Sequence, residues 1–467
     1  MRKGYNRRCV FTRFDYHAAI RQQKIFMPEF KRNKLAEFVK NDSGEFPPVF
    51  VGREDILEDI LDQSRHAFKR GSAPAKNTKV IHGAPGAGKT SLLTELSQRG
   101  KAEEHHPRTV VVTSAEIKNR LPDVMKAIVI AASKPQGQWF SALKTRGSDL
   151  GQRIGNVSFL SFQADFAQMT QPRGPDDLYS LARMVPSGKW EHPVILAIDE
   201  AQRLRGDIAT PYAEFLQAIH DANRVPLPLT LVFAGLGDTQ ERVNNIGITN
   251  CVNVFAVEAL NRQEQTQVID GFCEYFGVEV GTSRERLHSF FESTDGWPRH
   301  IYWAQCALAE TLLEPDIDGH MDKVSDWLTV EQRRDRFRIG YYEDRRSLAL
   351  KISDKLVGAV MKTVAVYNDR GIKINFSRLA DQINGYSNKF QGHSSGWCVP
   401  EDFGTGSSAV RRYIEHLVHQ GALAEDVWSD TYRCPIPSFQ SHLISRANFT
   451  PEESMALEQN LAAEIPE

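Results

Sequence analysis

Residues 83–90 read Gly83-Ala84-Pro85-Gly86-Ala87-Gly88-Lys89-Thr90, and they match the pattern G-x-x-x-x-G-K-[ST] in full. The segment before them, 79–82, predicts a short strand, and the segment after them, 91–96, predicts the start of a helix. Glycines let such a loop turn back on itself, so that its N–H groups and the helix N-terminus surround phosphates. The stretch therefore predicts a phosphate-binding loop (P-loop), rather than a glycine-rich turn without a ligand.

The polar residues of the loop have predicted roles in binding ATP. Lys89 would reach the β- and γ-phosphates, and the Thr90 hydroxyl would ligate Mg²⁺. The residues expected to surround the nucleotide in this stretch are Gly83, Ala84, Pro85, Gly86, Ala87, Gly88, Lys89, Thr90 and Ser91.

A second motif is an acidic pair that follows an apolar run. Residues 194–198 are apolar throughout, which is typical of a strand buried on both faces of a parallel sheet, and Asp199-Glu200 follows directly. Ligands of open α/β sheets bind at this end of the strands. We therefore expect Asp199 to hold Mg²⁺ through water and Glu200 to polarise the attacking water, which predicts hydrolysis of ATP. A strand that merely ends in a polar turn is the alternative.

The composition sets outer limits on the protein. A chain of 467 residues is long enough for two or three domains, and a hydrophobic content of 41% with 25% charged residues is that of a globular protein. No apolar run is long enough to span a membrane, and the basic N-terminus lacks the apolar segment of a secretory signal. The six cysteines are scattered, which favours a reducing cytoplasm over disulfides or a zinc site.

The charge is unevenly distributed along the chain. Residues 1–35 carry ten Lys or Arg against Asp15 and Glu29, within a leader that we assign to residues 1–46. Such a basic arm can contact the phosphate backbone of DNA, and a solvated tail is an equally good interpretation.

The rest of the chain divides by its periodicity. Strand and helix patterns alternate over residues 47–260, with a further candidate strand at 158–162 and a candidate helix at 176–184, which predicts a doubly wound parallel α/β core. Residues 261–350 are helical throughout and predict a separate lid. Three helical segments and a hairpin pattern within residues 351–446 predict a winged-helix-like domain, and residues 447–467 form an acidic tail.

The order of these parts resembles that of AAA+ ATPases, in the branch of helicase loaders, origin-recognition proteins and transposition-regulator ATPases. The stretch Phe50-Val51-Gly52-Arg53-Glu54 resembles the element that packs near the adenine there, which implies a nucleotide contact for Arg53. Gly296-Trp297-Pro298-Arg299 resembles the sensor-2 motif of the lid, which implies that Arg299 reaches the γ-phosphate. The latter residues also form an ordinary helix start with proline in the first turn. The resemblance covers residues 47–345, and more loosely 353–445.

Two features depart from this pattern. The strand predicted at 231–235 should end in a polar sensor-1 residue, but Asp238 and Thr239 are the first polar candidates after it. This Gly-Leu-Gly-Asp-Thr ending also resembles the switch ATPases of the STAND group. In addition, the segment 245–250 holds no arginine where an arginine finger usually lies, and Arg242 is upstream of it.

Two functions follow as alternatives. One is an ATPase that couples its nucleotide state to DNA or to a protein partner, with Arg411 and Arg412 of the winged helix as candidate DNA contacts. The long segment 387–407 between the last two helices is unusual for a helix-turn-helix, so protein contact is as plausible. The other is a STAND-like switch without direct DNA binding. An ATP-dependent homo-oligomer fits either function.

Overall fold

The computed structural model describes residues 29–40, 47–70, 78–99, 107–133, 190–204, 208–221, 227–249, 253–346, 354–390, 395–404, 406–426 and 431–464. The strand predicted at 158–162, the helix predicted at 176–184 and the basic residues before Glu29 lie outside these ranges.

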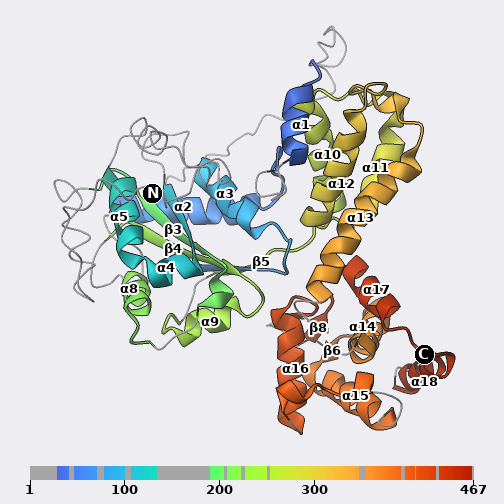
Figure 1. Ribbon diagram of the computed structural model, residues 1–467. Coiled ribbons are helices and arrows are strands. Elements are labelled where there is room, and N and C mark those ends of the chain that lie inside the picture. Colours follow the sequence, from blue (N-terminus) through green and yellow to red (C-terminus); the bar gives the residue numbers. More distant parts are fainter. Residues whose placement is uncertain are drawn as a thin grey trace, which may run out of the picture.

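A parallel five-stranded sheet forms the centre of the core, with strand order β2-β3-β4-β1-β5 (Figure 1). The register pairs Ile81 with Ala234 on one side of β1 and with Phe255 on the other. Because β1 lies between β4 and β5, it is not an edge strand, and the loop that follows it opens at the carboxyl edge of the sheet with a strand on either side. The strands are β1 (Thr78–His82), β2 (Arg108–Thr113), β3 (Val194–Asp199), β4 (Leu229–Gly235) and β5 (Asn253–Ala256).

Helices cover both faces of this sheet, and successive residues of β3 pack alternately against the helices of one face and of the other. Ile195 and Ala197 of β3 pack with the apolar residues of α2 and α3, whereas Leu196 and Ile198 pack with those of α4, α5 and α8. Every residue of β3 is buried, as the apolar run predicted. The predicted α/β fold is therefore confirmed. The helices are α2 (Glu54–Arg70), α3 (Lys89–Arg99), α4 (Ser114–Asn119), α5 (Leu121–Ser133), α8 (Pro211–His220) and α9 (Thr239–Asn245).

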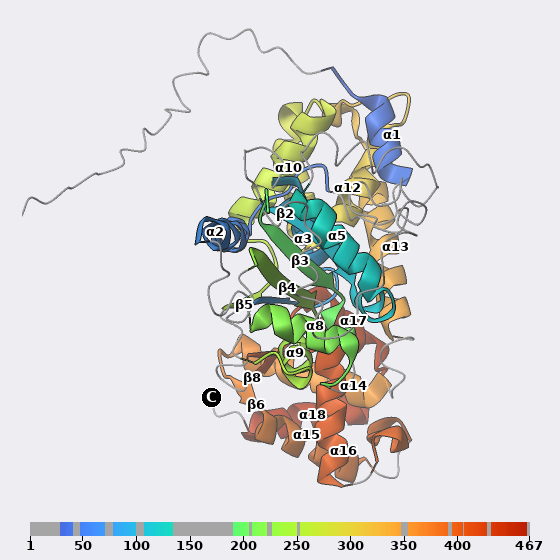
Figure 2. The same cartoon turned by 90° about the vertical axis from the view of Figure 1, so that its left-hand side faces the viewer.

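The lid helices lie beside the core and include a helix from the basic leader (Figures 1 and 2). The backbone N–H of Lys31 donates to the carbonyl of Phe276, and Arg32 pairs with Asp318 at 2.8 Å. These two residues of the leader are therefore bonded to α10 and to the segment between α12 and α13. The helices are α1 (Arg32–Lys40), α10 (Arg262–Phe276), α11 (Arg284–Glu292), α12 (Pro298–Leu312) and α13 (Trp327–Arg345).

The C-terminal region, residues 354–464, contains the three predicted helices and the predicted hairpin. Strand β8 pairs antiparallel with both β6 and β7. Two further helices, α17 and α18, follow the hairpin, so the acidic tail is helical over much of its length. The elements are α14 (Asp354–Asp369), β6 (Ile374–Asn375), α15 (Phe376–Lys389), α16 (Ser407–His419), β7 (Ala424–Asp426), β8 (Thr431–Arg433), α17 (Pro437–Arg446) and α18 (Pro451–Glu464).

The long connection between α15 and α16 is anchored by one tryptophan. Trp397 is fully buried and stacks on Phe390 at 4.1 Å between ring centroids. Its indole N–H donates to Glu453 of α18, whose carboxylate also accepts from Lys355 of α14 at 2.6 and 2.9 Å. Trp397 of the connection is therefore part of the core of the C-terminal region.

Within the described residues, no helix combines the length and the apolar character that a membrane crossing needs.

Candidate nucleotide site

The P-loop has the curled backbone that the glycine spacing predicts. Gly86 and Gly88 have φ angles of 84° and 90°, a region that residues with a Cβ rarely adopt. The Lys89 ammonium donates to the carbonyl oxygens of Gly83 at 2.8 Å and Ala84 at 3.1 Å, across the mouth of the loop. The N–H of Gly83 donates to the carbonyl of Gly235 at 3.2 Å, which joins the loop to the end of β4.

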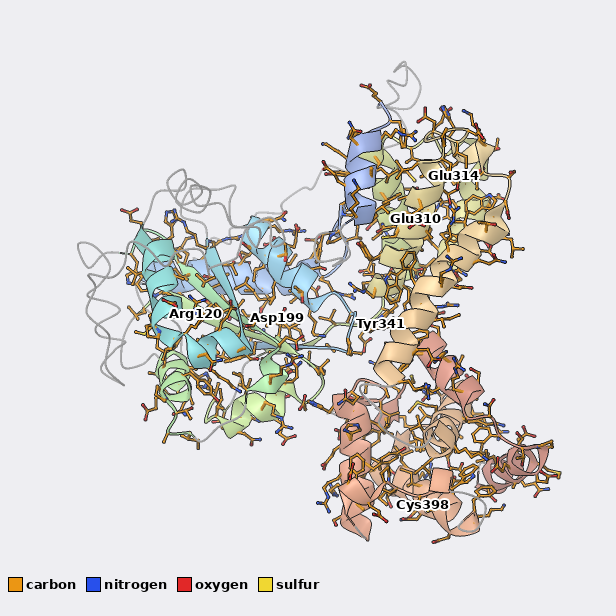
Figure 3. All side chains as sticks on the ribbon, viewed as in Figure 1. Arg120, Asp199, Glu310, Glu314, Tyr341 and Cys398 are labelled. Carbon is orange, nitrogen blue, oxygen red and sulfur yellow. The ribbon has the colours of Figure 1, made fainter. Side chains whose placement is uncertain are left out.

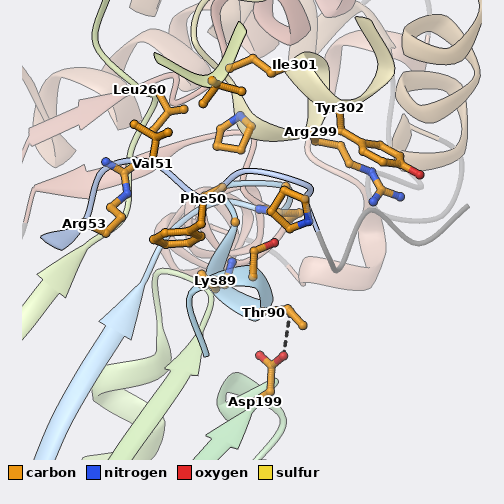
Figure 4. Close-up of a pocket in the computed structure, with 18 of the residues that line it drawn as sticks. Phe50, Val51, Arg53, Lys89, Thr90, Asp199, Leu260, Arg299, Ile301 and Tyr302 are labelled. Atoms are coloured by element: carbon orange, nitrogen blue, oxygen red, sulfur yellow. Dashed lines mark hydrogen bonds between the residues drawn. The ribbon is translucent and has the colours of Figure 1, made fainter. Parts of the chain in front are cut away.

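The end of β3 meets the P-loop at Thr90. The Thr90 hydroxyl donates to Asp199 Oδ2 at 2.8 Å, and the backbone N–H of Glu200 donates to Asp199 Oδ1 at the same distance (Figure 4). A hydroxyl and a carboxylate are hard oxygen ligands, which is the donor set that Mg²⁺ prefers. These two residues therefore fit the predicted metal site.

Glu200 sits in a constrained backbone conformation at the start of the next turn. Its φ and ψ of 56° and 33° are left-handed, which is uncommon for a residue other than glycine and recurs at functional sites. Its carboxylate accepts from Gln202 Nε2 and from Arg203 Nε, each at 3.0 Å. Neither partner is predicted by the motif, although Gln202 and Arg203 follow the acidic pair closely.

A cavity of about 500 Å³ opens between the P-loop and the lid helices. The acidic pair, residues 85–90 of the P-loop and Ser91 form its polar part. Gly83 and Ala84, which were also expected at the nucleotide, line a different cavity. Figure 4 shows an apolar part on the other side of the P-loop, where side chains of the 47–51 stretch face the lid. This division suits a nucleotide, because a base needs apolar contact and phosphates need N–H groups and cations. The apolar lining includes Phe50, Val51, Leu260, Ile301 and Tyr302.

Arg53 lines the same cavity, but its side chain is engaged with the loop after β5. Its guanidinium donates to the carbonyl of Glu258, and its backbone φ of 66° is left-handed. Burial lowers the pKa of Arg53, and the nearby carboxylates of Glu264, Asp55 and Glu258 oppose that shift. Arg53 therefore lines the cavity near the apolar residues Val51 and Leu260, and its contact with a nucleotide stays a prediction.

Arg299 lies against the P-loop through its backbone. Its N–H donates to the carbonyl of Gly86 at 3.2 Å, and a Cβ on Gly86 would come within 2.9 Å of the Arg299 Cβ. Its guanidinium lies 5.8 Å and 5.5 Å from the ring centroids of Tyr302 and Trp303 (Figure 4). The first turn of α12 therefore lies at the P-loop, while the guanidinium of Arg299 lies over two aromatic rings of the same helix.

The candidate sensor-1 residues lie elsewhere than at the cavity. Thr239 is fully buried and donates to the carbonyl of Leu236 at 2.6 Å. The Asp238 carboxylate accepts from Arg242 at 3.0 Å and from His419 of α16 at 2.9 Å. Burial disfavours the ionised form of Asp238, but His419 and Arg242 outweigh it and hold its pKa below the ordinary value.

The C-terminal region contacts the core at two ion pairs near this edge. One is Asp238 with His419, and the other joins Glu258 to Arg433 of β8. Arg411 and Arg412 lie on the exposed face of α16, where the Arg411 guanidinium is 4.3 Å from the Phe376 ring centroid and Arg412 donates to Ser408.

The end of α13 connects the cavity with the C-terminal region. The Tyr341 hydroxyl donates to the P-loop carbonyl of Pro85 at 3.3 Å, and Figure 3 shows Tyr341 on the side of α13 that faces the core. The next residue, Tyr342, is bonded to His300 of α12 and to Ser438 of α17, each at 2.8 Å. Nothing in the local sequence pattern singled out this tyrosine pair, because its partners lie far away in the chain.

Three comparisons place the chain among known proteins. Residues 49–232 match the family model of the AAA ATPase domain. No curated protein matches the chain.

Solved structures that resemble it include the Walker-type ATPase of Pyrococcus abyssi, with 15% identity, 84% of this chain and 97% of that chain covered and a TM-score of 0.47. The ORC2 protein of Aeropyrum pernix, solved as ADPNP–ADP complexes, has 14% identity, coverage of 93% and 99% and a TM-score of 0.48. Its ORC1 protein in complex with DNA has 14% identity, coverage of 90% and 97% and a TM-score of 0.39.

The family match covers the P-loop, the acidic pair and most of β4, and the sheet around them has the P-loop NTPase architecture. Residues 49–232 of this chain are therefore similar to AAA ATPase domains, within a P-loop NTPase fold.

Proposed function

We propose that this chain is a cytoplasmic ATPase that hydrolyses Mg²⁺-bound ATP and passes its nucleotide state to the C-terminal region. The observation that carries the proposal is the convergence of Lys89, the Thr90–Asp199 pair and Glu200 on one cavity of about 500 Å³. These groups come from the start of α3 and from the end of β3, which are distant in sequence, and each has a separate task in phosphoryl transfer.

The roles follow from the chemistry of each group. Lys89 exchanges its two carbonyl partners for oxygens of the β- and γ-phosphates. Thr90 and Asp199 would hold Mg²⁺, which supplies positive charge against the phosphates. The Glu200 carboxylate accepts a proton from the attacking water, or orients that water, at the carboxyl edge of the sheet.

The first test measures Mg²⁺-dependent release of phosphate by the wild-type chain and by Glu200→Gln. The amide keeps the shape of the side chain but loses its charge, so turnover should fall by about a hundredfold or more while ATP still binds. We expect this ATP-trapped variant to favour any ATP-dependent homo-oligomer, which sedimentation would detect. Turnover at the wild-type rate would remove Glu200 from the mechanism.

Coupling to the C-terminal region is supported by the contacts of α13. Tyr341 bonds to the P-loop, and the next residue, Tyr342, bonds to Ser438 of α17. A change of lid position on ATP binding would therefore act on the C-terminal region through α13.

We propose DNA as the partner of this region, through a winged helix in which Arg411 and Arg412 of α16 contact phosphates. Both side chains are exposed on the face of the helix opposite its buried Tyr413 and Ile414. Fluorescence anisotropy with duplex DNA should show binding that weakens steeply with salt and weakens further in Arg411→Ala/Arg412→Ala. Binding unaffected by the double substitution would exclude this surface.

A nucleotide switch that binds a protein partner is the second candidate. It is favoured by the two ion pairs that dock the C-terminal region on the core. This function predicts no salt-dependent DNA affinity at all, in either nucleotide state, so the same titration separates the two candidates.

A further inference from the structure

Gln202 connects the ends of two core strands next to the hydrolytic carboxylate. It lies in the turn Ala201–Arg203 after β3, is 5% exposed and lines the nucleotide cavity. Its Oε1 accepts from the backbone N–H of Leu236 at 3.2 Å, and its Nε2 donates to Glu200 Oε2 at 3.0 Å.

The orientation of this amide follows from its partners. A backbone N–H can only donate, so the oxygen of Gln202 must face Leu236. The NH₂ group then has to face the Glu200 carboxylate, which can only accept when ionised. Both ends of the amide are therefore fixed, and the Glu200 carboxylate is held at a set position relative to β4.

The residue at the end of β4 makes room for this side chain. A Cβ on Gly235 would come within 2.4 Å of Gln202 Oε1 and 2.3 Å of Thr239 Oγ1. The end of the strand therefore carries no side chain of its own, and the Gln202 amide occupies that space. Leu236 is the residue after this strand that lines the cavity, and it presents no polar side chain.

We infer that Gln202 is a positioning residue for ATP hydrolysis, which holds the Glu200 carboxylate in place through a bond anchored on β4. The role rests on the proposed function, since it requires that Glu200 acts on the attacking water. Arg203 also contacts Glu200, but its side chain is 73% exposed, so water and salt weaken its hold. The buried, doubly bonded amide is the firmer anchor.

Two substitutions at this position separate positioning from mere packing. Gln202→Leu removes both bonds, whereas Gln202→Glu keeps the shape and the acceptor for Leu236 but removes the donor to Glu200. We expect both variants to lower kcat by about tenfold to a hundredfold, with the KM for ATP and the equilibrium affinity within about twofold of wild type. A Gln202→Glu variant with wild-type kcat would overturn the inference, as would a rise of kcat in Gln202→Leu.

A matched pair of glycine substitutions tests the space at the strand end. Gly235→Ala would displace the Gln202 amide and should lower kcat, with the melting temperature recorded alongside. The control is Gly237→Ala, whose Cβ would meet only Val418 at 3.5 Å, an ordinary contact, and which should keep the wild-type kcat. Equal kcat values for the two variants would contradict the role.

A double-variant cycle completes the test. If Gln202 acts through Glu200, Gln202→Leu should change the single-turnover rate of Glu200→Gln by less than about twofold. A full additional loss in that background would mean that Gln202 acts independently. A wild-type chain that binds ATP without hydrolysing it would instead refute the proposed function, and this role with it, whereas the other outcomes refute only the role of Gln202.

Discussion

The nucleotide site and the buried polar cluster of the C-terminal region use the same kinds of side chain in opposite ways. In the C-terminal region, the Glu453 carboxylate accepts from Lys355 and from Trp397, and Glu453 is 3% exposed. Around the P-loop, Lys89 bonds to two loop carbonyls at the edge of a cavity. In the function that we propose, Lys89 is held by partners that a ligand can replace, whereas the structural anion Glu453 is enclosed by partners from its own fold.

Lys89→Ala should produce the largest effect. In the proposed site the ammonium would be the point charge for the β- and γ-phosphates, and each lost charge-assisted contact is worth about 1.5–3 kcal/mol. We expect ATP affinity to fall by about a hundredfold or more in equilibrium binding, with little change in melting temperature. An affinity within twofold of wild type would show that Lys89 is structural, like Glu453, and the comparison would fail.

Arg299→Ala should have the next largest effect, and it tests whether a cation stacked on aromatic rings is functional or structural. If the guanidinium leaves Tyr302 and Trp303 for the γ-phosphate, the variant should lose about 1.5–3 kcal/mol more affinity for ATP than for ADP. Isothermal titration with both nucleotides measures this difference. Equal losses for ATP and ADP would assign Arg299 to the packing of the lid helices.

Glu453→Gln should destabilise the protein by about 1–3 kcal/mol without changing ATP affinity, since it breaks a bond to Lys355 in a buried place. Denaturant unfolding followed by Trp fluorescence measures the loss, and ATP affinity serves as the control. A parallel loss of ATP affinity would show that this cluster is coupled to the site.

The pH dependence of that stability has a definite sign. Burial raises the pKa of Glu453. The hydrogen bonds from Lys355, from the N–H of Thr450 and from Trp397 lower it by more than burial raises it, so the pKa in the folded state is below the ordinary value. The stabilisation is then complete above about pH 4.3, the unfolded value, and is lost as the pH falls through the folded pKa. Glu453→Gln should remove this part of the acid sensitivity.

The smallest effect is expected at Asp238–His419, one of the two pairs that join the core to the C-terminal region. The Asp238 and His419 side chains are 12% and 29% exposed, so their coupling should be about 0.2–1 kcal/mol in a double-mutant cycle of Asp238→Asn and His419→Ala. The unfolding free energies of the four proteins at low and high salt provide the measurement. A coupling of zero at low salt would mean that the Glu258–Arg433 pair and apolar contacts dock the C-terminal region.

Much of the fold could be predicted from local sequence. The P-loop turn, the buried strand before Asp199 and the hairpin in the C-terminal region each depend on a pattern within a few residues, and the structure contains all of them. The charges of residues 447–467 indicate only an acidic tail, yet α18 forms within it and Glu453 is buried against Lys355. That pairing spans 98 residues and has no local signature.

Local sequence specifies which chemical groups are present at the site: glycines that permit positive φ, a lysine and a threonine in a fixed order, and an acidic pair at a strand end. These are properties of the backbone and of neighbouring residues. Which of these groups meet depends on the fold of the whole chain. It joined Thr90 to Asp199 across 109 residues, Gln202 to Leu236 across 34 and His419 to Asp238 across 181. The first two bonds form because the parallel sheet brings the carboxyl ends of separate strands to one edge, and the third forms where α16 of the C-terminal region meets the core. No local pattern encodes which side chains meet in this way.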